Sequence, residues 1–150
     1  MEKQYVRFFA MILTSTVIMF GMMYLNVFQL DHIFYSQTRV YMALMMGAAM
    51  AIIMLLFMWK MYQNKKANLA ILIGSVIVFG LSLGAVRTQA NIQDVAWLKA
   101  MIPHHSIAIL TSKKADLKDP RVQELAQKII QTQEKEITEM KRLIKDLRAK

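Results

Sequence analysis

The sequence predicts an all-α protein in which three transmembrane helices are followed by an extramembrane antiparallel helical hairpin. Apolar residues concentrate before residue 86 and charged residues after it, which indicates two regions in different solvents. The first region contains three long apolar stretches, and in the second the apolar residues recur at helical spacing. A hydrophobic content of 56% in 150 residues is also high for a soluble domain. We therefore expect the chain to divide into residues 1–87 and 88–150.

Residues 1–87 are predicted to form the three-span transmembrane region. The apolar stretches cover about residues 5–30, 41–59 and 68–86, and about 20 apolar residues suffice to cross a bilayer. Basic residues gather before the first span and between the second and third, whereas the first loop and the segment after the third span each carry a single arginine. Because basic segments remain in the cytoplasm, we expect a multi-pass protein of a bacterial inner membrane with a cytoplasmic N-terminus. The C-terminal domain would then be periplasmic.

Residues 88–150 are predicted to form a helical hairpin, with helices at about 91–115 and 120–148. Pro103 lies inside the first helical pattern, which continues beyond it, so we expect a bend and not a helix end. Asp119-Pro120 is a strong start signal for the second helix, with the aspartate as N-cap. Two helices alone bury little apolar surface. The hairpin is therefore expected to form a homo-oligomer or to pack onto the membrane helices.

Composition and motifs exclude several classes of function. The chain has no cysteine, which rules out disulfides, zinc–thiolate sites and thiol catalysis. The net charge of +9 could suggest nucleic acid, but the tail mixes both signs, as a solvated helical surface does. The paired Glu-x-x-His motifs of di-iron bundles and the His-Glu-x-x-His motif are missing, and no Ser/His/Asp grouping is evident. We expect a protein that is not an enzyme, and His32 is interpreted as a polar loop residue beside Asp31.

One short stretch has the composition of a soft-metal site. His104 and His105 are adjacent, and Met101 precedes them by one helical turn, so it shares a face with each. Folding the hairpin would bring Glu136 and Met140 of the second helix within reach. Thioether and imidazole ligands favour Cu(I), and by extension Ag(I). Spacing alone leaves open the alternative that the histidines are structural and the methionines fill the core.

Three segments of the hairpin resemble a known family. They are Asp94 with Met101-Ile-Pro-His-His-Ser-Ile-Ala, Asp119-Pro-Arg-Val-Gln-Glu-Leu-Ala-Gln-Lys-Ile-Ile, and Gln133-Glu-Lys-Glu-Ile-Thr-Glu-Met140. Together, over about residues 91–148, they resemble the family catalogued as Domain of Unknown Function 305, whose better-known relatives are CopM-like periplasmic copper-binding proteins with a ferritin-like helical fold. The resemblance implies copper ligation by Met101, His104, His105 and Met140. It implies a second shell or lesser ligands at Asp94, Gln133 and Glu136. Three membrane spans and a single hairpin distinguish this chain from the soluble members.

The second span carries a separate hint of metal handling. Methionines recur there every four residues, at Met42, Met46, Met50, Met54 and Met58. The third span contains Gly80-x-x-x-Gly84, a helix-packing motif. This pair of features is similar to the eukaryotic Ctr-type copper transporters, although the expected topology is opposite and methionine is common in apolar helices.

Three hypotheses follow from the sequence. The leading one is a membrane-anchored periplasmic binding protein for Cu(I) or Ag(I) that acts in tolerance or in hand-over to copper-handling proteins. The second is a transporter with a Met-lined path in the second span. The third is a structural or oligomerisation module of the membrane without metal. Lipid and a second copy are the expected partners, and nucleic acid is not.

Overall fold

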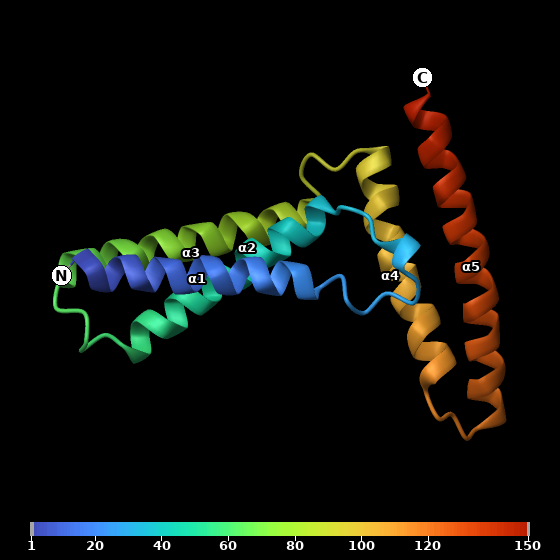
Figure 1. Cartoon of the computed structure of the whole chain (residues 1–150), viewed down its shortest axis with the longest axis horizontal. Coiled ribbons are helices and arrows are strands. Elements are labelled where there is room, and N and C mark those ends of the chain that lie inside the picture. Colours follow the sequence, from blue (N-terminus) through green and yellow to red (C-terminus); the bar gives the residue numbers. More distant parts are fainter. Residues whose placement is uncertain (1, 150) are drawn as a thin grey trace. The chain divides into compact units, whose positions relative to one another are not determined.

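The computed structural model describes residues 2–149, and every regular element in that range is helical (Figure 1). This confirms the predicted all-α fold. The chain divides into two compact units: a three-helix unit with α1, nearly all of α2 and α3, and a hairpin unit with the segment Tyr24–Gln37, α4 and α5. The elements, in chain order, are α1 Glu2–Met22, a 3₁₀ turn at Leu30–His32, α2 Gln37–Phe57, α3 Lys65–Thr88, α4 Asp94–Lys114 and α5 Pro120–Arg148.

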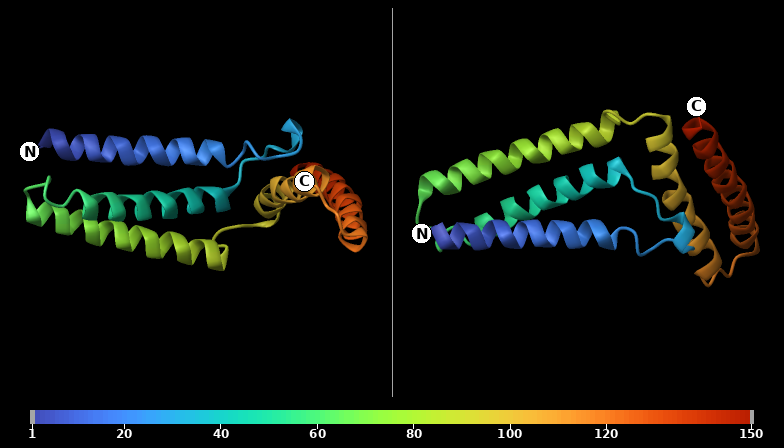
Figure 2. Two further views of the ribbon diagram at one scale, coloured as in Figure 1. Left: turned by 90° about the horizontal axis from the view of Figure 1, so that it is seen from below. Right: turned by 45° about the horizontal axis from the view of Figure 1, so that its top comes forward.

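Each helix of the three-helix unit is long and apolar enough to cross a membrane, and the three lie lengthwise beside one another (Figure 2). The first helix, predicted to run to about residue 30, ends at Met22 because the chain then leaves it to join the hairpin unit. The second helix starts at Gln37 and ends at Phe57, and the third covers Lys65–Thr88, so both are shifted or longer than predicted. The Asn64 side chain caps α3 by accepting a hydrogen bond from the amide of Ala67 at 3.1 Å.

Small and aromatic residues pack the interior of the three-helix unit. Phe8 of α1 and Leu55 of α2 are fully buried in one cluster with Tyr62. At the same end, the Tyr5 hydroxyl donates to the Asn68 side chain at 2.9 Å, and the Asn68 amide donates to the Tyr62 carbonyl at 2.8 Å. Hydrogen bonds as well as packing therefore join the start of α1, the loop between α2 and α3, and the start of α3.

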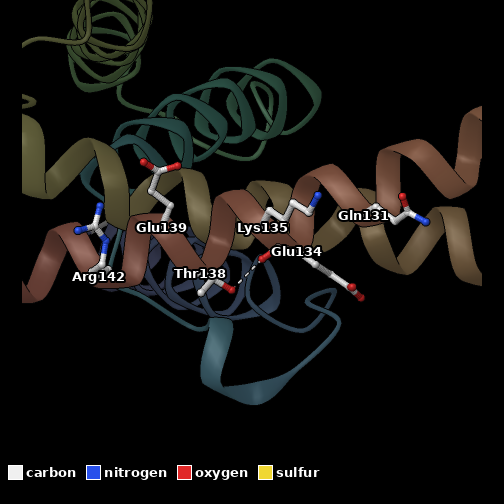
Figure 3. Close-up of a pocket in the computed structure, with 6 residues that line it drawn as sticks. All are labelled: Gln131, Glu134, Lys135, Thr138, Glu139 and Arg142. Atoms are coloured by element: carbon white, nitrogen blue, oxygen red, sulfur yellow. Dashed lines mark hydrogen bonds between the residues drawn. The ribbon is translucent and has the colours of Figure 1, made fainter.

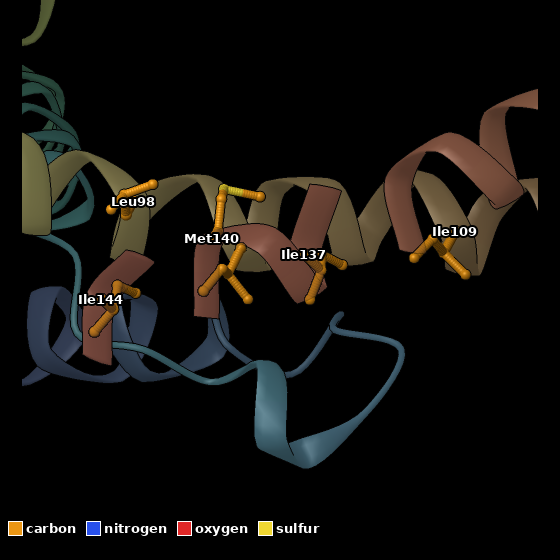
Figure 4. Close-up of a cluster of buried hydrophobic side chains, with 6 residues drawn as sticks. Leu98, Ile109, Ile137, Met140 and Ile144 are labelled. Atoms are coloured by element: carbon orange, nitrogen blue, oxygen red, sulfur yellow. The ribbon is translucent and has the colours of Figure 1, made fainter. Parts of the chain in front are cut away.

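In the hairpin unit, α4 and α5 run side by side in opposite directions (Figure 2). Figure 4 shows the apolar side chains that fill the space between them. Six of these residues are buried: Leu98, Ile102, Ile109, Ile137, Met140 and Ile144. At roughly 1.5–3 kcal/mol for each large apolar side chain withdrawn from water, this row is the main stabilising contribution within the unit.

The ends of the two hairpin helices follow local sequence signals. α5 begins at Pro120, as predicted, with the Asp119 carboxylate accepting a hydrogen bond from the Arg121 amide at 2.9 Å. α4 starts at Asp94, later than the predicted residue 91, because Asn91 has a left-handed backbone with φ 57°. Pro103 lies inside α4, and the helix continues through it to Lys114.

Candidate metal centre

His105 is the predicted histidine that faces the opposite helix. Its Nδ1 lies 2.9 Å from the carbonyl oxygen of Met101, one turn earlier on α4. Its Nε2 lies 2.9 Å from a carboxylate oxygen of Glu136 on α5, and its side chain is only 14% exposed. Because a carbonyl oxygen only accepts hydrogen bonds, Nδ1 must carry a hydrogen and donate it. The Met101 carbonyl therefore fixes the ring's orientation and leaves Nε2 as the nitrogen that a proton or a metal can occupy.

Both predicted thioether residues belong to the same level of the hairpin. Met140 is 6% exposed and is one of the six core residues (Figure 4). Met101 is half-buried and packs against that core. Met101 and His105 are one turn apart on α4, and Glu136 and Met140 are one turn apart on α5. The contact between His105 and Glu136 joins the two pairs. The structure thus brings two thioethers, one imidazole and one carboxylate to one stretch of the hairpin.

The other predicted ligands are placed differently. His104 is exposed, and its ring centre is 6.2 Å from that of His105, because adjacent helical residues point about 100° apart. Gln133 is half-buried on α5, one turn before Glu136. Asp94 is exposed in the first turn of α4, and a helical rise of about 1.5 Å per residue puts it roughly 16 Å from His105 along the axis. The structure therefore does not bring Asp94 to this centre.

The hairpin contains most of the residues that match a known family. Residues 82–144 match the family described as a domain of unknown function, DUF305. An uncharacterised protein of Acanthamoeba polyphaga mimivirus is 40% identical over 106 residues, which cover 69% of this chain and 68% of that protein. The chain belongs to the DUF305 family. No solved structure matches it. The matched residues include all of α4 and α5 as far as Ile144, so the DUF305 region contains every member of the candidate centre.

The methionines of α2, which lie outside the DUF305 match, do not form one buried row. Met42 is 37% exposed, and Met58 lies beyond the end of α2 at Phe57. Met46, Met50 and Met54 are half-buried. The buried face of α2 consists instead of mostly small residues, namely Ala43, Gly47, Ala48, Ala51 and Leu55. A four-residue repeat advances about 40° per step around a helix, so the five methionines spread over nearly half its circumference.

The glycines of α2 and α3 differ in their surroundings. A Cβ atom at Gly47 would collide with the Thr16 side chain of α1, so glycine allows these two helices to approach closely. A Cβ atom at Gly80 or Gly84 would meet nothing within 4 Å. At these two glycines of the predicted packing motif, α3 therefore has no close approach to another helix of the described chain.

The sequence interpretation missed a second polar cluster in the DUF305 protein. His32 is buried, with Nδ1 2.9 Å from the Ser106 hydroxyl, and Asp31 forms an ion pair with Lys141 at 2.6 Å. Burial, the largest effect, and the charge of Lys141 lower the pKa of His32, and Asp31 opposes them in part. The hydrogen bond from Lys141 is the largest cause that lowers the pKa of Asp31. His32 thus lies in the loop between α1 and α2, as interpreted, but the sequence did not indicate that it is buried against a helix distant in sequence.

Asp31, His32 and Ser106 also make the Ser/His/Asp grouping that was not evident in the sequence. It lacks the geometry of a nucleophilic triad. The Ser106 side chain is fully buried, and its oxygen accepts a hydrogen bond from the Phe28 amide at 2.7 Å. The His32 Nε2 is 3.7 Å from the Asp31 carboxylate, too far for a hydrogen bond. The grouping therefore has a structural role: it attaches the segment between α1 and α2 to α4 and α5.

The outer face of α5 offers only an open depression, drawn in Figure 3. All its lining side chains come from this one helix: Gln131, Glu134, Lys135, Thr138, Glu139 and Arg142. Acidic and basic groups alternate there, and the Thr138 hydroxyl donates to the Glu134 carbonyl at 2.9 Å. This is a solvated helical surface, and we assign it no ligand.

Proposed function

We propose that this DUF305 protein is a membrane-anchored binding protein for Cu(I) or Ag(I), acting in metal tolerance or in hand-over to another copper-handling protein. The observation that supports this most directly is the contact between His105 and Glu136 across the hairpin, with Met101 one turn away on α4 and Met140 one turn away on α5. The metal is cargo in this proposal, and no reaction is assigned to the protein.

The chemistry of the four side chains suits a soft monovalent ion. Thioether sulfur and neutral imidazole are preferred by Cu(I), whereas Mg²⁺ and Ca²⁺ require several oxygen ligands. Among the described residues, no three His, Asp or Glu side chains are grouped as a metal site. His105 donates from Nδ1 to a backbone carbonyl, the support that metal-bound histidines usually have.

Metal would replace a proton at this site. With Nδ1 donating to the Met101 carbonyl, Nε2 contacts the Glu136 carboxylate favourably only when it also carries a hydrogen. A metal ion on Nε2 would take the place of that hydrogen, and Glu136 could then accompany or partly neutralise the bound cation. Metal bound at Nε2 should therefore displace the hydrogen held there.

The three apolar helices are compatible with membrane association. We propose that they anchor the protein with the N-terminus in the cytoplasm and the hairpin outside, since the loop charges favour that orientation. His104, exposed beside His105, is then available to a second copy or to a protein that receives the metal.

The arrangement of side chains on α2 supports a binding protein more than a transporter that conducts metal across the membrane. A conducting path would use a continuous row of methionines, whereas the most buried positions of α2 are small residues and Met58 lies outside the helix. Metal flux into proteoliposomes tests this alternative. Flux that disappears when Met46, Met50 and Met54 are changed to leucine would establish transport instead.

The test of the binding proposal is a Cu(I) titration of the full-length protein in detergent against a chromophoric chelator. We expect His105→Ala to weaken binding by at least about tenfold, the lower end of losses seen even for residues that only support ligands. Asp94→Asn is the matched control, because Asp94 lies on the same helix but distant from the centre, and it should bind as the native protein does. Equal affinity of the native protein and His105→Ala would overturn the proposal.

A further inference from the structure

The segment Tyr24–Gln37, which connects α1 to α2, forms a third part of the hairpin unit. We call it the clasp segment. Its Phe28 amide donates to the Ser106 hydroxyl oxygen at 2.7 Å, and the His32 Nδ1 lies 2.9 Å from the same oxygen. Ser106 has no exposed surface and His32 has 6%. Because buried polar groups without partners are costly, this three-way contact specifies one way of docking the clasp segment on α4.

A second attachment joins the clasp segment to α5. Asp31 pairs with Lys141 at 2.6 Å. The apolar side chains of Phe28 and Phe34 pack against the hairpin core, and the ammonium of Lys113 lies 4.4 Å from the centre of the Phe28 ring. The clasp segment therefore contacts both helices, through hydrogen bonds on α4 and an ion pair on α5.

The two attachment points are sequence neighbours of candidate metal ligands. Ser106 directly follows His105 on α4, and Lys141 directly follows Met140 on α5. Adjacent side chains on a helix differ in direction by about 100°. Fixing the direction of Ser106 and Lys141 therefore also fixes the direction of their neighbours about each helix axis.

We propose that the clasp segment is a positioning element of the metal centre: its docking on Ser106 and Lys141 holds α4 and α5 in the rotation that places His105 opposite Glu136. This inference rests on the proposed metal binding. It adds that residues which touch no metal, in a loop between the first two apolar helices, set the affinity of the centre. Thermodynamic linkage makes the effect reciprocal. If docking of the clasp segment raises the affinity for metal by a given factor, bound metal raises the equilibrium constant for docking by the same factor.

The decisive variant is Ser106→Ala, which removes the shared oxygen and leaves the Phe28 amide and the His32 ring without their partner. Thr111→Ala is the matched control, because Thr111 is also a hydroxyl residue of α4 but bonds only to carbonyls of its own helix. Two quantities are measured on full-length protein in detergent: amide hydrogen exchange of the Phe28 amide and its segment, and Cu(I) affinity by chelator competition.

We expect Ser106→Ala to accelerate exchange of the Phe28 amide by about tenfold or more and to weaken Cu(I) binding several-fold, while Thr111→Ala changes neither. His32→Asn should retain most of the affinity, because its amide can replace Nδ1, whereas His32→Leu should lose it. Cu(I) added to the native protein should slow exchange of the Phe28 amide. If the clasp segment had only a structural role, the Cu(I) affinity of the folded variants would be unchanged, and Cu(I) would not slow exchange of the Phe28 amide.

A milder variant protects the test against misfolding. Lys141→Gln removes the partly exposed ion pair with Asp31 and leaves the core intact, so it should show the same two effects at smaller size. Rapid exchange of the Phe28 amide in the native protein would overturn the docking itself. Slow exchange together with equal Cu(I) affinity in the native protein and Ser106→Ala would overturn the positioning role. Absence of Cu(I) binding by the native protein would overturn the proposed function and the positioning role with it, whereas the exchange data would still decide the docking.

Discussion

Met140 is the residue at which packing and metal binding can be separated. It is 6% exposed and sits in the row of six core residues between α4 and α5. Truncation to alanine removes that packing and leaves a cavity, for which buried methionines typically lose about 2–5 kcal/mol. Leucine has nearly the same volume and usually costs less than about 1.5 kcal/mol, but it has no sulfur. Met140→Leu should therefore preserve the fold and remove one predicted ligand.

The assay follows unfolding of the hairpin unit by the fluorescence of Trp97 in the full-length protein in detergent. A background of Trp59→Phe removes the signal from the three-helix unit, since Trp59 and Trp97 are the two tryptophans. With about 4–8 °C of midpoint shift per kcal/mol for a unit of this size, Met140→Ala should lower the midpoint by at least about 8 °C. Met140→Leu should lower it by clearly less.

The affinity measurement on the same variants then tests ligation. Met140→Leu should weaken Cu(I) binding by about tenfold, of the order seen when support of a metal site is lost. Met22→Leu is the control, since Met22 is an exposed methionine at the end of α1. Unchanged affinity in Met140→Leu would refute thioether ligation at this position, and a loss of stability equal to that of alanine would refute the packing argument.

Three further predictions concern docking, capping and helix packing. Burial lowers the pKa of His32, so the docked clasp segment binds fewer protons than the undocked one, and docking is strongest above the ordinary histidine pKa of 6.5 and weakens as the pH falls through it. Exchange of the Phe28 amide, corrected for its intrinsic pH dependence, should therefore accelerate from about pH 7.5 to pH 5.5. A corrected rate that does not change with pH would contradict this. Asp119→Ala should destabilise the hairpin unit because the N-cap hydrogen bond to the Arg121 amide is lost; the measurement is a lower unfolding midpoint. Gly47→Val should lower the thermal stability of the three-helix unit in detergent because its side chain meets α1, whereas Gly80→Val, in open space, should not; equal effects would show that the close approach at Gly47 is unimportant.

Local sequence signals predicted the hairpin helices well. Asp119-Pro120 marks the start of α5, because the aspartate side chain accepts a hydrogen bond from a free amide of the first turn and proline has no amide hydrogen to leave unpaired. The pairing of His105 with Glu136 was also within reach of sequence reasoning. It follows from the spacing of apolar residues on two antiparallel helices.

The sequence could not predict which of the two histidines faces the opposite helix. The sequence places His104 and His105 about 100° apart, but the rotation of α4 against α5 decides which one faces inward, and the structure turns His105 to Glu136 and leaves His104 exposed. Rotation depends on the fit of the whole row of core side chains, which no local pattern encodes.

The end of the first apolar helix is likewise decided by tertiary contacts that the sequence does not reveal. Hydrophobicity alone extended the first span to about residue 30, since the residues after Met22 include several apolar and aromatic side chains. Those side chains are used elsewhere: Phe28 and Phe34 pack on the hairpin core, and His32 bonds to a serine 74 residues away. By itself the sequence determined that the chain is helical, that it has three long apolar helices and which residue types could bind a soft metal. Only the tertiary structure decided that the clasp segment belongs to the hairpin and which ligand candidates meet, because contacts between residues distant in the chain leave no periodic signal in it.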